Sequence, residues 1–326
     1  MLRLVDLARA ADRGADPDPG RVAPPGVVVA HGSASDIAEG ISTSESWLAA
    51  ATFTLTEDEC ADRRVITVDS VPRALAELRQ RCQRWPHASA VCDDVLRAID
   101  PCGPTLSGLV TESLAYSTLQ AGPEFARWLA ERGPARMPDI PDPVLVGRDG
   151  DTVVIRFNRP QRHNAFSTDA RAGLLDALDV ALIDPSVTGI VLRGNGASFC
   201  SGGDLAEFGT FADPASAHLA RTRHSPALSL DELTGRLGPA CRARVHGRVM
   251  GSGLEMAAFC GRVDAHPDSV LGLPELALGL IPGAGGTVSV TRRIGRWRTA
   301  YLVLTGSTVD AGTALEWGLV DAISDR

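Results

Sequence analysis

The sequence predicts a layered α/β protein, and three observations lead to that prediction. Strand-like apolar runs alternate with amphipathic helical segments through the C-terminal half of the chain. Glycine-rich turns separate several of these strands from the helices that follow, as in folds that bind ligands at helix N-termini. With 326 residues, of which 44% are hydrophobic and 22% charged, the chain has enough apolar side chains for a sizeable core.

The C-terminal half begins with two strands within residues 144–160, joined by a turn at Gly150. A helix is expected next, over residues 167–184, with Ser167 or Thr168 as its cap and apolar side chains at approximately helical spacing.

The following elements repeat the strand–turn–helix order. Residues 189–194 read as a buried strand, followed by a glycine-containing loop and a helix beginning near Asp204. Residues 241–247 form another strand, and a Gly-Ser-Gly turn leads into a helix that starts near Leu254.

A proline-rich stretch, residues 133–143, divides the chain into an N-terminal extension, 1–140, and a C-terminal core, 141–326. The extension is mixed and mainly helical. Residues 15–26 read as a flexible or extended arm. Strands are expected at 52–58 and 64–69, and helical stretches at 72–84, 88–99 and 105–131.

Composition excludes several classes of protein. No run of about 18 apolar residues occurs, and the N-terminus lacks a signal peptide, so we expect a cytoplasmic protein. A net charge of −8 argues against nonspecific nucleic-acid binding. The seven cysteines show no CxxC pair and the seven histidines no HExxH motif, so no metal is expected.

Two glutamates in apolar, glycine-rich segments are the leading catalytic candidates. Glu255 lies in residues 244–259 and Glu275 in residues 271–287. Carboxylates rarely enter such surroundings unless they are paired or used in chemistry, and two facing one site could act as general acid and base. The structural alternatives are a carboxylate at a helix N-terminus for Glu255 and a capping or paired group for Glu275.

A third glycine-rich segment, residues 193–205, could present free backbone N–H groups to a carbonyl oxygen. On its own it could equally be a structural turn.

Taken together and in order, these segments resemble the crotonase superfamily, the enoyl-CoA hydratase/isomerase family. The resemblance covers residues 144–326 and rests on motifs at 158–167, 198–205, 244–255 and 273–287, with a helix-turn-helix stretch at 300–323. It implies a ββα spiral core and a homotrimer or hexamer.

The resemblance also implies an acyl-CoA substrate, with coenzyme A as part of the substrate and no prosthetic group. By motif position, the oxyanion hole consists of the N–H groups of Gly203 and Ser252. Serine replaces the usual glycine at 252, and His246 replaces the usual asparagine. Glu255 and Glu275 match the two glutamates of the family's hydratases.

Five residues match positions near the coenzyme A of the family: Arg162, His163, Ala165, Ser201 and Asp204. Arginines at this place suit an anionic cofactor on an acidic protein, although they could also be solvated surface residues. For Asp204 we favour a helix cap over a place beside the adenine.

The chain stops where the family normally continues into a helical tail. Residues 64–82 and 109–134 resemble that tail, and Gly122, Phe125 and Trp128 fit its pattern loosely. We hypothesise that residues 50–134 fold as the missing tail. The alternative is an independent helical cap domain.

The sequence therefore predicts an enoyl-CoA hydratase that adds water in syn fashion across a 2,3 double bond. Alternatives within the superfamily are an isomerase or a cofactor-independent dioxygenase. Outside catalysis, a CoA-binding or assembly protein remains open.

Overall fold

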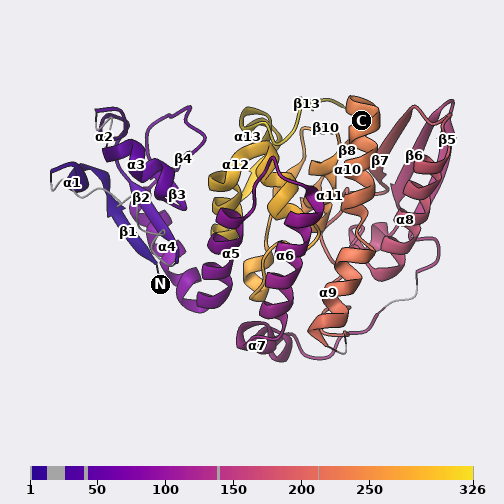
Figure 1. Ribbon diagram of the computed structural model, residues 1–326, viewed down its shortest axis with the longest axis horizontal. Helices are drawn as coiled ribbons and strands as arrows, with labels where there is room; N and C mark the ends of the chain where they lie inside the picture. The colour runs from indigo at the N-terminus through magenta and orange to yellow at the C-terminus, as the bar shows by residue number, and fades with distance from the viewer. Residues whose placement is uncertain (1, 13–25, 40–42, 138–139, 212, 326) are drawn as a thin grey trace.

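The structure is a computed structural model that describes residues 2–12, 26–39, 43–137, 140–211 and 213–325. The described residues form three sheets. Figure 1 shows the sheet of β1–β4 at one end of the long axis and the strands β5–β8 toward the other end, with helices between them. No helix in the described ranges has the length and apolar character needed to cross a membrane.

The first sheet lies at the N-terminal end and consists of four parallel strands in the order β1-β2-β3-β4. Its strands are β1 (Arg3–Asp6), β2 (Val28–His31), β3 (Phe53–Thr56) and β4 (Val65–Thr67). Helices α1 (Leu7–Asp12), α2 (Ala34–Glu39) and α3 (Thr43–Ala50) accompany it.

Strands β3 and β4 agree with the expected strands, whereas β1 and β2 were not predicted. Strand length does not explain the difference, because β1, β2 and β3 each have four residues and β4 has three. β1 pairs with β2, and β2 pairs with β3, so both become recognisable as strands through the sheet. Most of the expected extended arm, 15–26, lies outside the described residues.

Four helices follow the first sheet: α4 (Val71–Arg84), α5 (Pro86–Ala98), α6 (Thr105–Gln120) and α7 (Pro123–Arg132). The single helical stretch expected at 105–131 is thus two helices. Gly122 caps α7 with an extended backbone and Pro123 opens it. Proline cannot continue α6, because it lacks an N–H and crowds the preceding turn, but it suits the first turn of a new helix.

The second sheet forms the centre of the C-terminal region, in the order β13-β10-β8-β7-β6-β5, and all its pairs are parallel except β5–β6. Along β6, Val153, Ile155 and Phe157 point into the core between less buried neighbours. The strands are β5 (Val144–Asp149), β6 (Thr152–Phe157), β7 (Gly189–Gly194), β8 (Cys241–Val245), β10 (Arg262–Ala265) and β13 (Ala322–Ile323).

The third sheet has the order β12-β11-β9, with β9 (Arg248–Met250), β11 (Val270–Gly272) and β12 (Thr308–Asp310). The helices of this half are α8 (Thr168–Ile183), α9 (Pro214–Arg223), α10 (Pro226–Leu237), α11 (Ser252–Phe259), α12 (Gly286–Thr305) and α13 (Ala311–Trp317). Short 3-10 turns occur at Pro160–Arg162, Gly238–Ala240 and Glu275–Leu278.

Two local predictions at helix starts can be compared with the structure. Ser167 does cap α8, since its Oγ accepts a hydrogen bond from Ala170 N at 3.1 Å. The prediction that a helix begins near Asp204 is wrong. Residues 205–209 form turns, Gly209 has a φ of +83°, and the next helix begins only at α9, which Asp213 caps.

The helices α4–α7 share one buried core with the C-terminal region. Leu78, Leu109 and Phe125 belong to the same cluster of buried side chains as Leu254 and Val288. Helices α5 and α6 pack on α12, as Figure 1 shows. The approach is closest at Gly108, where a Cβ would lie 2.5 Å from Val288 Cγ2.

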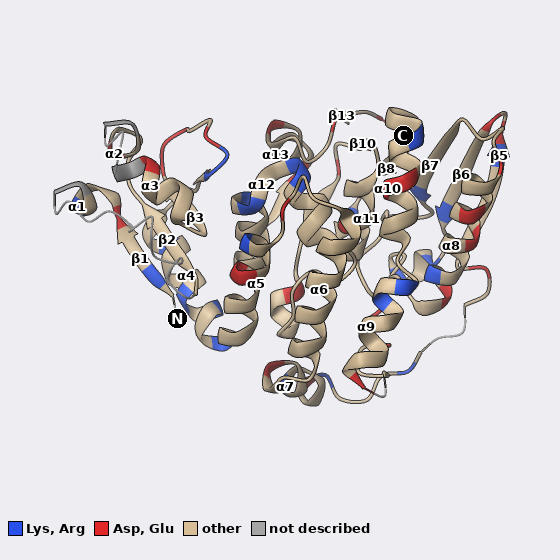
Figure 2. Cartoon of the chain, viewed as in Figure 1, with Lys and Arg blue, Asp and Glu red and all other residues tan. Residues whose placement is uncertain are grey.

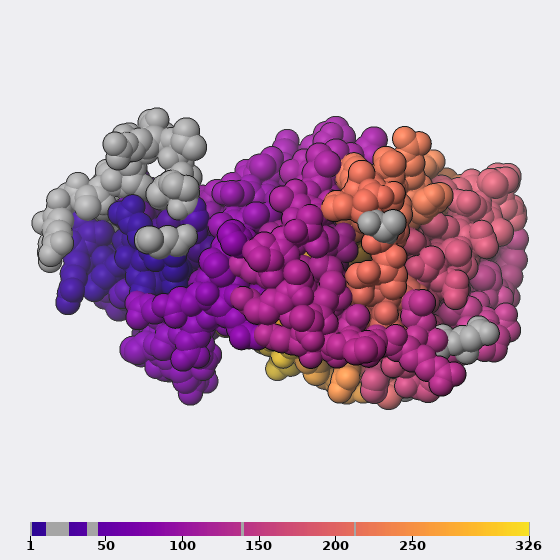
Figure 3. All heavy atoms as spheres, turned by 90° about the horizontal axis from the view of Figure 1, so that it is seen from below, coloured from indigo at the N-terminus to yellow at the C-terminus, as the bar shows by residue number. Residues whose placement is uncertain are grey.

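A second, smaller cluster of buried side chains lies at the far end of the molecule. We call it the outer cluster: Val5, Leu7, Ala10, Val28, Ala30, Trp47 and Ala51. Along β2, Val28 and Ala30 face this cluster, whereas Val27 and Val29 face the main core. Figure 3 shows these N-terminal residues at one end of an elongated molecule.

Candidate active site

Two glycine-containing loops meet at the predicted oxyanion hole. Cys200 forms a parallel bridge with Val249, and Phe166 forms one with Gly203. Phe166 N donates a hydrogen bond to Gly202 O at 2.8 Å, and Asp204 N donates one to Phe166 O at 2.9 Å. The bridge between Phe166 and Gly203 therefore uses backbone groups of Gly202 and Asp204, and it leaves the N–H of Gly203 itself free.

Ser252 contributes the second N–H group of this site. It is the first residue of α11, where the backbone N–H groups have no acceptor within the helix. No described residue accepts a hydrogen bond from Gly203 N or Ser252 N. Two unbonded N–H groups at neighbouring loops can hold a carbonyl oxygen that gains negative charge.

Glu255 is buried in the first turn of α11. Its Oε2 accepts hydrogen bonds from Ala284 N and Gly286 N, both at 2.7 Å. Burial raises the pKa of Glu255 well above its ordinary value, and the nearby charges of Glu275 and Glu112 raise it further.

Glu275 opens the 3-10 turn Glu275–Leu278 and is also buried. Gly251, with a φ of +48°, lets the chain pass close to it: a Cβ there would lie 2.5 Å from Glu275 Oε1. Glu275 Oε2 is buried and has no hydrogen-bond partner among the described residues. Burial raises the pKa of Glu275 to about 8.

Both glutamates and both N–H groups line one pocket. Its walls are otherwise largely aromatic and small side chains, with two arginines. The lining residues are Tyr116, Phe166, Arg171, Gly203, Phe208, Arg221, His224, Ser225, Pro226, Ser252, Glu255, Glu275, Gly283 and Ala284. The structure thus brings together the four residues that the sequence analysis assigned to catalysis and to the oxyanion hole, and their roles stay predictions.

A third carboxylate, Glu112 of α6, was missed by the sequence analysis. It is buried and accepts hydrogen bonds from Gly285 N at 2.7 Å and Thr287 N at 2.9 Å, and from Thr287 Oγ1 at 2.6 Å. Burial raises its pKa to about 7. Together, Glu112 and Glu255 accept hydrogen bonds from the four consecutive N–H groups of residues 284–287, at the start of α12. The only sequence signal was an acidic residue within a largely apolar helix.

The five predicted CoA-binding residues lie on two adjacent loops. Arg162 Nη2 contacts Asp204 Oδ1 at 2.8 Å, and Arg159 Nη2 contacts Asp204 Oδ2 at 2.7 Å. Ser201 N donates to His163 O at 3.0 Å, and Ala165 N to Arg162 O at 3.0 Å.

The expectation that Asp204 caps a helix is wrong. No helix begins there, and its carboxylate pairs with the two arginines and accepts from Ala206 N within a turn. A buried carboxylate between two guanidinium groups is better stabilised than one facing a single helix terminus. His246, at the position where the family usually has asparagine, bonds through Nε2 to Gly196 O at 3.0 Å.

Comparisons with known proteins identify the family of this chain. The family model described as enoyl-CoA hydratase/isomerase matches residues 148–326. The chain is 32% identical over 180 residues to the 2,3-dehydroadipyl-CoA hydratase of Escherichia coli strain K12, covering 55% of this chain and 68% of that protein. It is 33% identical over 178 residues to an enoyl-CoA isomerase/hydratase of Mycosarcoma maydis, covering 52% and 63%.

Solved structures give the same result. The enoyl-CoA hydratase of Mycobacterium smegmatis matches with a TM-score of 0.50 at 31% identity, over 56% of this chain and 69% of that one. DspI of Pseudomonas aeruginosa matches with a TM-score of 0.50 at 30% identity, over 59% and 77%. The crotonase-type α/β fold and the enzyme class predicted from the sequence are confirmed. This chain belongs to the enoyl-CoA hydratase/isomerase family of the crotonase superfamily.

Proposed function

We propose that this enzyme is an enoyl-CoA hydratase that adds water across the 2,3 double bond of an acyl-CoA thioester. The observation that supports it best is the pair of buried carboxylates, Glu255 and Glu275, in one pocket with the unbonded N–H groups of Gly203 and Ser252. Two interacting carboxylates in a low-dielectric site keep a proton at neutral pH, so the pair holds both an acid and a base.

The hydrogen bonds support different roles for the two carboxylates. Two N–H donors stabilise the anionic form of Glu255. No described donor reaches Glu275 Oε2, so this residue holds the shared proton. Glu255 is then the general base and Glu275 the general acid.

In the reaction, the thioester oxygen accepts hydrogen bonds from Gly203 N and Ser252 N, which withdraws electrons from C3. Glu255 removes a proton from water as the water oxygen bonds to C3. Glu275 gives its proton to C2, and proton exchange through solvent restores the pair. Each oxyanion donor contributes about 3 kcal/mol to the stability of the transition state.

The test is hydration of crotonyl-CoA and of a longer enoyl-CoA, followed by the loss of absorbance of the conjugated thioester. We expect Glu255→Gln and Glu275→Gln each to lower kcat by roughly 10²–10⁴-fold while CoA-ester binding persists. Turnover that is unchanged in either variant would refute the paired mechanism.

Isomerisation is the second candidate, because the less tethered carboxylate, Glu275, could carry a proton between C2 and C4 without a base for water. The same variants separate the two reactions. An isomerase would shift the double bond of a 3-enoyl-CoA and would keep that activity in Glu255→Gln.

We also propose that residues 50–134 complete the catalytic fold in the way that the family's helical tail does. Three contacts support this. Glu112 holds the start of α12, Arg132 of α7 donates to Leu205 O and Phe208 O beside the oxyanion loop, and Arg81 of α4 donates to Leu304 O. If so, a protein of residues 141–326 alone will be inactive. Adding residues 26–137 as a separate chain will restore its activity. An independent cap domain would leave residues 141–326 folded and active.

A further inference from the structure

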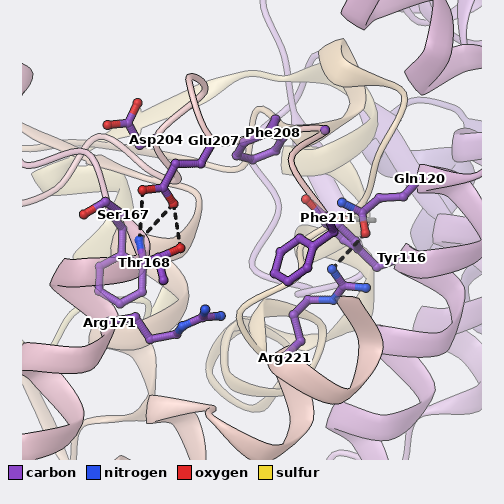
Figure 4. A pocket seen from close by; sticks show the side chains of 12 residues that line it. Tyr116, Gln120, Ser167, Thr168, Arg171, Asp204, Glu207, Phe208, Phe211 and Arg221 are labelled. Atoms are coloured by element: carbon purple, nitrogen blue, oxygen red, sulfur yellow. Dashed lines mark hydrogen bonds between the residues drawn. The ribbon is translucent and has the colours of Figure 1, made fainter. Parts of the chain in front are cut away.

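The catalytic pocket continues into a second hollow, and two arginines line both. Tyr116, Phe166, Arg171, Phe208 and Arg221 line the two spaces in common. Figure 4 shows Arg171 of α8 and Arg221 of α9 on different sides of this space, with the Arg221 guanidinium turned toward Gln120. The mechanism above uses neither guanidinium group.

Arg221 is fixed in position by neutral groups only. Its Nε donates to Ser113 Oγ at 3.2 Å, its Nη1 donates to Gln120 Oε1 at 2.9 Å, and its Nη2 donates to Ser117 Oγ. The guanidinium also lies 4.4 Å from the centre of the Tyr116 ring. No carboxylate of the described residues forms an ion pair with it, although the charge of the buried Glu112 favours its charged form without touching it.

Arg171 is less constrained. It lies in the first turn of α8 and is half-buried, and its side chain forms no hydrogen bond or ion pair with a described residue. Two acidic residues, Asp204 and Glu207, line the second hollow, and Asp204 is paired with Arg159 and Arg162. Glu207 lies beside the start of α8. Its two oxygens accept from Thr168 N at 3.1 and 2.8 Å, and from Thr168 Oγ1 at 2.9 Å. Glu207 is thus engaged with the start of α8.

Burial is the largest cause of the lowered pKa of both Arg171 and Arg221. The charge of Glu207 opposes this lowering at Arg171, and Tyr116 and Glu112 oppose it at Arg221, where the like charge of Arg171 adds to the lowering. Two guanidinium groups that line one pocket and repel each other are stabilised by an anion between them. In Figure 2 the ribbon of α9 is coloured blue, for Lys and Arg, near its end.

We propose that Arg171 and Arg221 bind a carboxylate at the far end of the acyl chain, so that the substrates are enoyl-CoA esters of dicarboxylic acids. This inference rests on the proposed function, because it places the double bond at Glu255 and Glu275 in the same pocket. The arginines line the hollow together with the aromatic side chains of Tyr116, Phe208 and Phe211, which suit the methylene groups of such a chain.

A phosphate of coenzyme A is the other anion that could reach arginines. The observations favour the acyl carboxylate. The arginines line the pocket of the two glutamates, and the pantetheine arm separates the phosphates from the thioester by its whole length.

The experiment compares pairs of 2-enoyl-CoA esters of equal chain length, one ending in a methyl group and one in a carboxylate. A hydrogen-bonded ion pair is worth about 1.5–3 kcal/mol, which is roughly 10–150-fold in kcat/KM. We expect the carboxylate ester to be preferred by at least about tenfold. In Arg171→Gln that preference should fall by about tenfold or more through a higher KM for the carboxylate ester. The matched control is Arg223→Gln, an exposed arginine of α9 that lines neither space.

Binding of saturated acyl-CoA esters, measured by calorimetry, tests the inference independently of hydration. Saturated esters cannot be hydrated, so a preference for the carboxylate ester that Arg171→Gln removes would support it even if no enoyl-CoA is turned over. Equal binding of the two esters by the unmodified enzyme would overturn it. Weaker binding of coenzyme A itself to Arg171→Gln would also overturn it and assign the arginine to a phosphate.

Discussion

Two parts of the N-terminal region differ in what they pack against. Around α1 and α3, the outer cluster has its own small core, far from the glutamates. Helices α4–α7, which precede the same proline-rich stretch, contribute Leu78, Leu109 and Phe125 to the core of the catalytic region. Segments on the same side of the proline-rich stretch therefore pack into two different hydrophobic clusters. The start of α12, where Glu112 binds, shows the difference most clearly.

The largest effect is expected at Glu275, in the centre of the shared unit. Its pKa in the folded state, about 8, exceeds its ordinary value of 4.5. The unfolded chain therefore loses this proton first, and the stability of the fold falls as pH rises from about 4.5 to about 8. Glu275→Gln should remove this loss, which amounts to roughly 5 kcal/mol at most, and should also abolish activity.

Urea unfolding of the two proteins at about pH 5 and about pH 9 checks this. The stability gain of the variant should appear only at the higher pH. A gain that is equal at both pH values would contradict the buried, protonated Glu275.

The next effect concerns Glu112, which joins α6 to the catalytic region. Glu112→Ala leaves the N–H groups of Gly285 and Thr287 without an acceptor. We expect a loss of roughly 2–4 kcal/mol in the free energy of unfolding. We also expect a large fall in kcat, because the same turn holds Glu255. Glu112→Gln keeps one acceptor and should be intermediate.

Trp47→Ala is the contrasting variant in the outer cluster. It should destabilise that cluster by about 3–5 kcal/mol and leave kcat unchanged. Chemical unfolding and steady-state kinetics measure both effects. If kcat fell as far in Trp47→Ala as in Glu112→Ala, the comparison between the two parts would fail.

A smaller effect is expected at Gly108, where α6 approaches α12. Alanine favours a helix by about 1 kcal/mol over glycine. However, its Cβ would meet Val288 Cγ2 at 2.5 Å, and such overpacking costs about 1–3 kcal/mol. Gly108→Ala should therefore destabilise. Gly235→Ala in α10, where a Cβ meets nothing within 4 Å, should stabilise by about 0.5–1 kcal/mol. Thermal unfolding of both variants measures the sign of each change.

The smallest effect is a shift in the pH profile. Burial is the main cause of the raised pKa of Glu275, and the charge of Glu112 adds to it. Glu112→Gln should therefore lower that pKa and move the alkaline limb of the kcat profile to lower pH. An unmoved limb would show that the two carboxylates do not interact.

Much of the fold and site could be predicted from local patterns. The glycine-flanked positions of Gly203, Ser252, Glu255 and Glu275 are short-range signals, because backbone approach and positive φ demand glycine at Gly251 and Gly202. The Ser167 cap depends on a residue three positions away. By contrast, β1 and β2 are recognisable as strands only through their pairing in the first sheet, and Asp204 reads as a cap until its two arginine partners are seen.

The sequence alone determined the α/β class, the family and the four residues proposed for catalysis, because these depend on short motifs whose chemistry is local. The tertiary structure decided which distant groups share the site. Glu112 meets Gly285 across 173 positions of the chain, and Arg171 meets the pocket of Glu255 and Glu275 only through folding. Contacts of that range arise from packing of buried surfaces, and no local spacing encodes them.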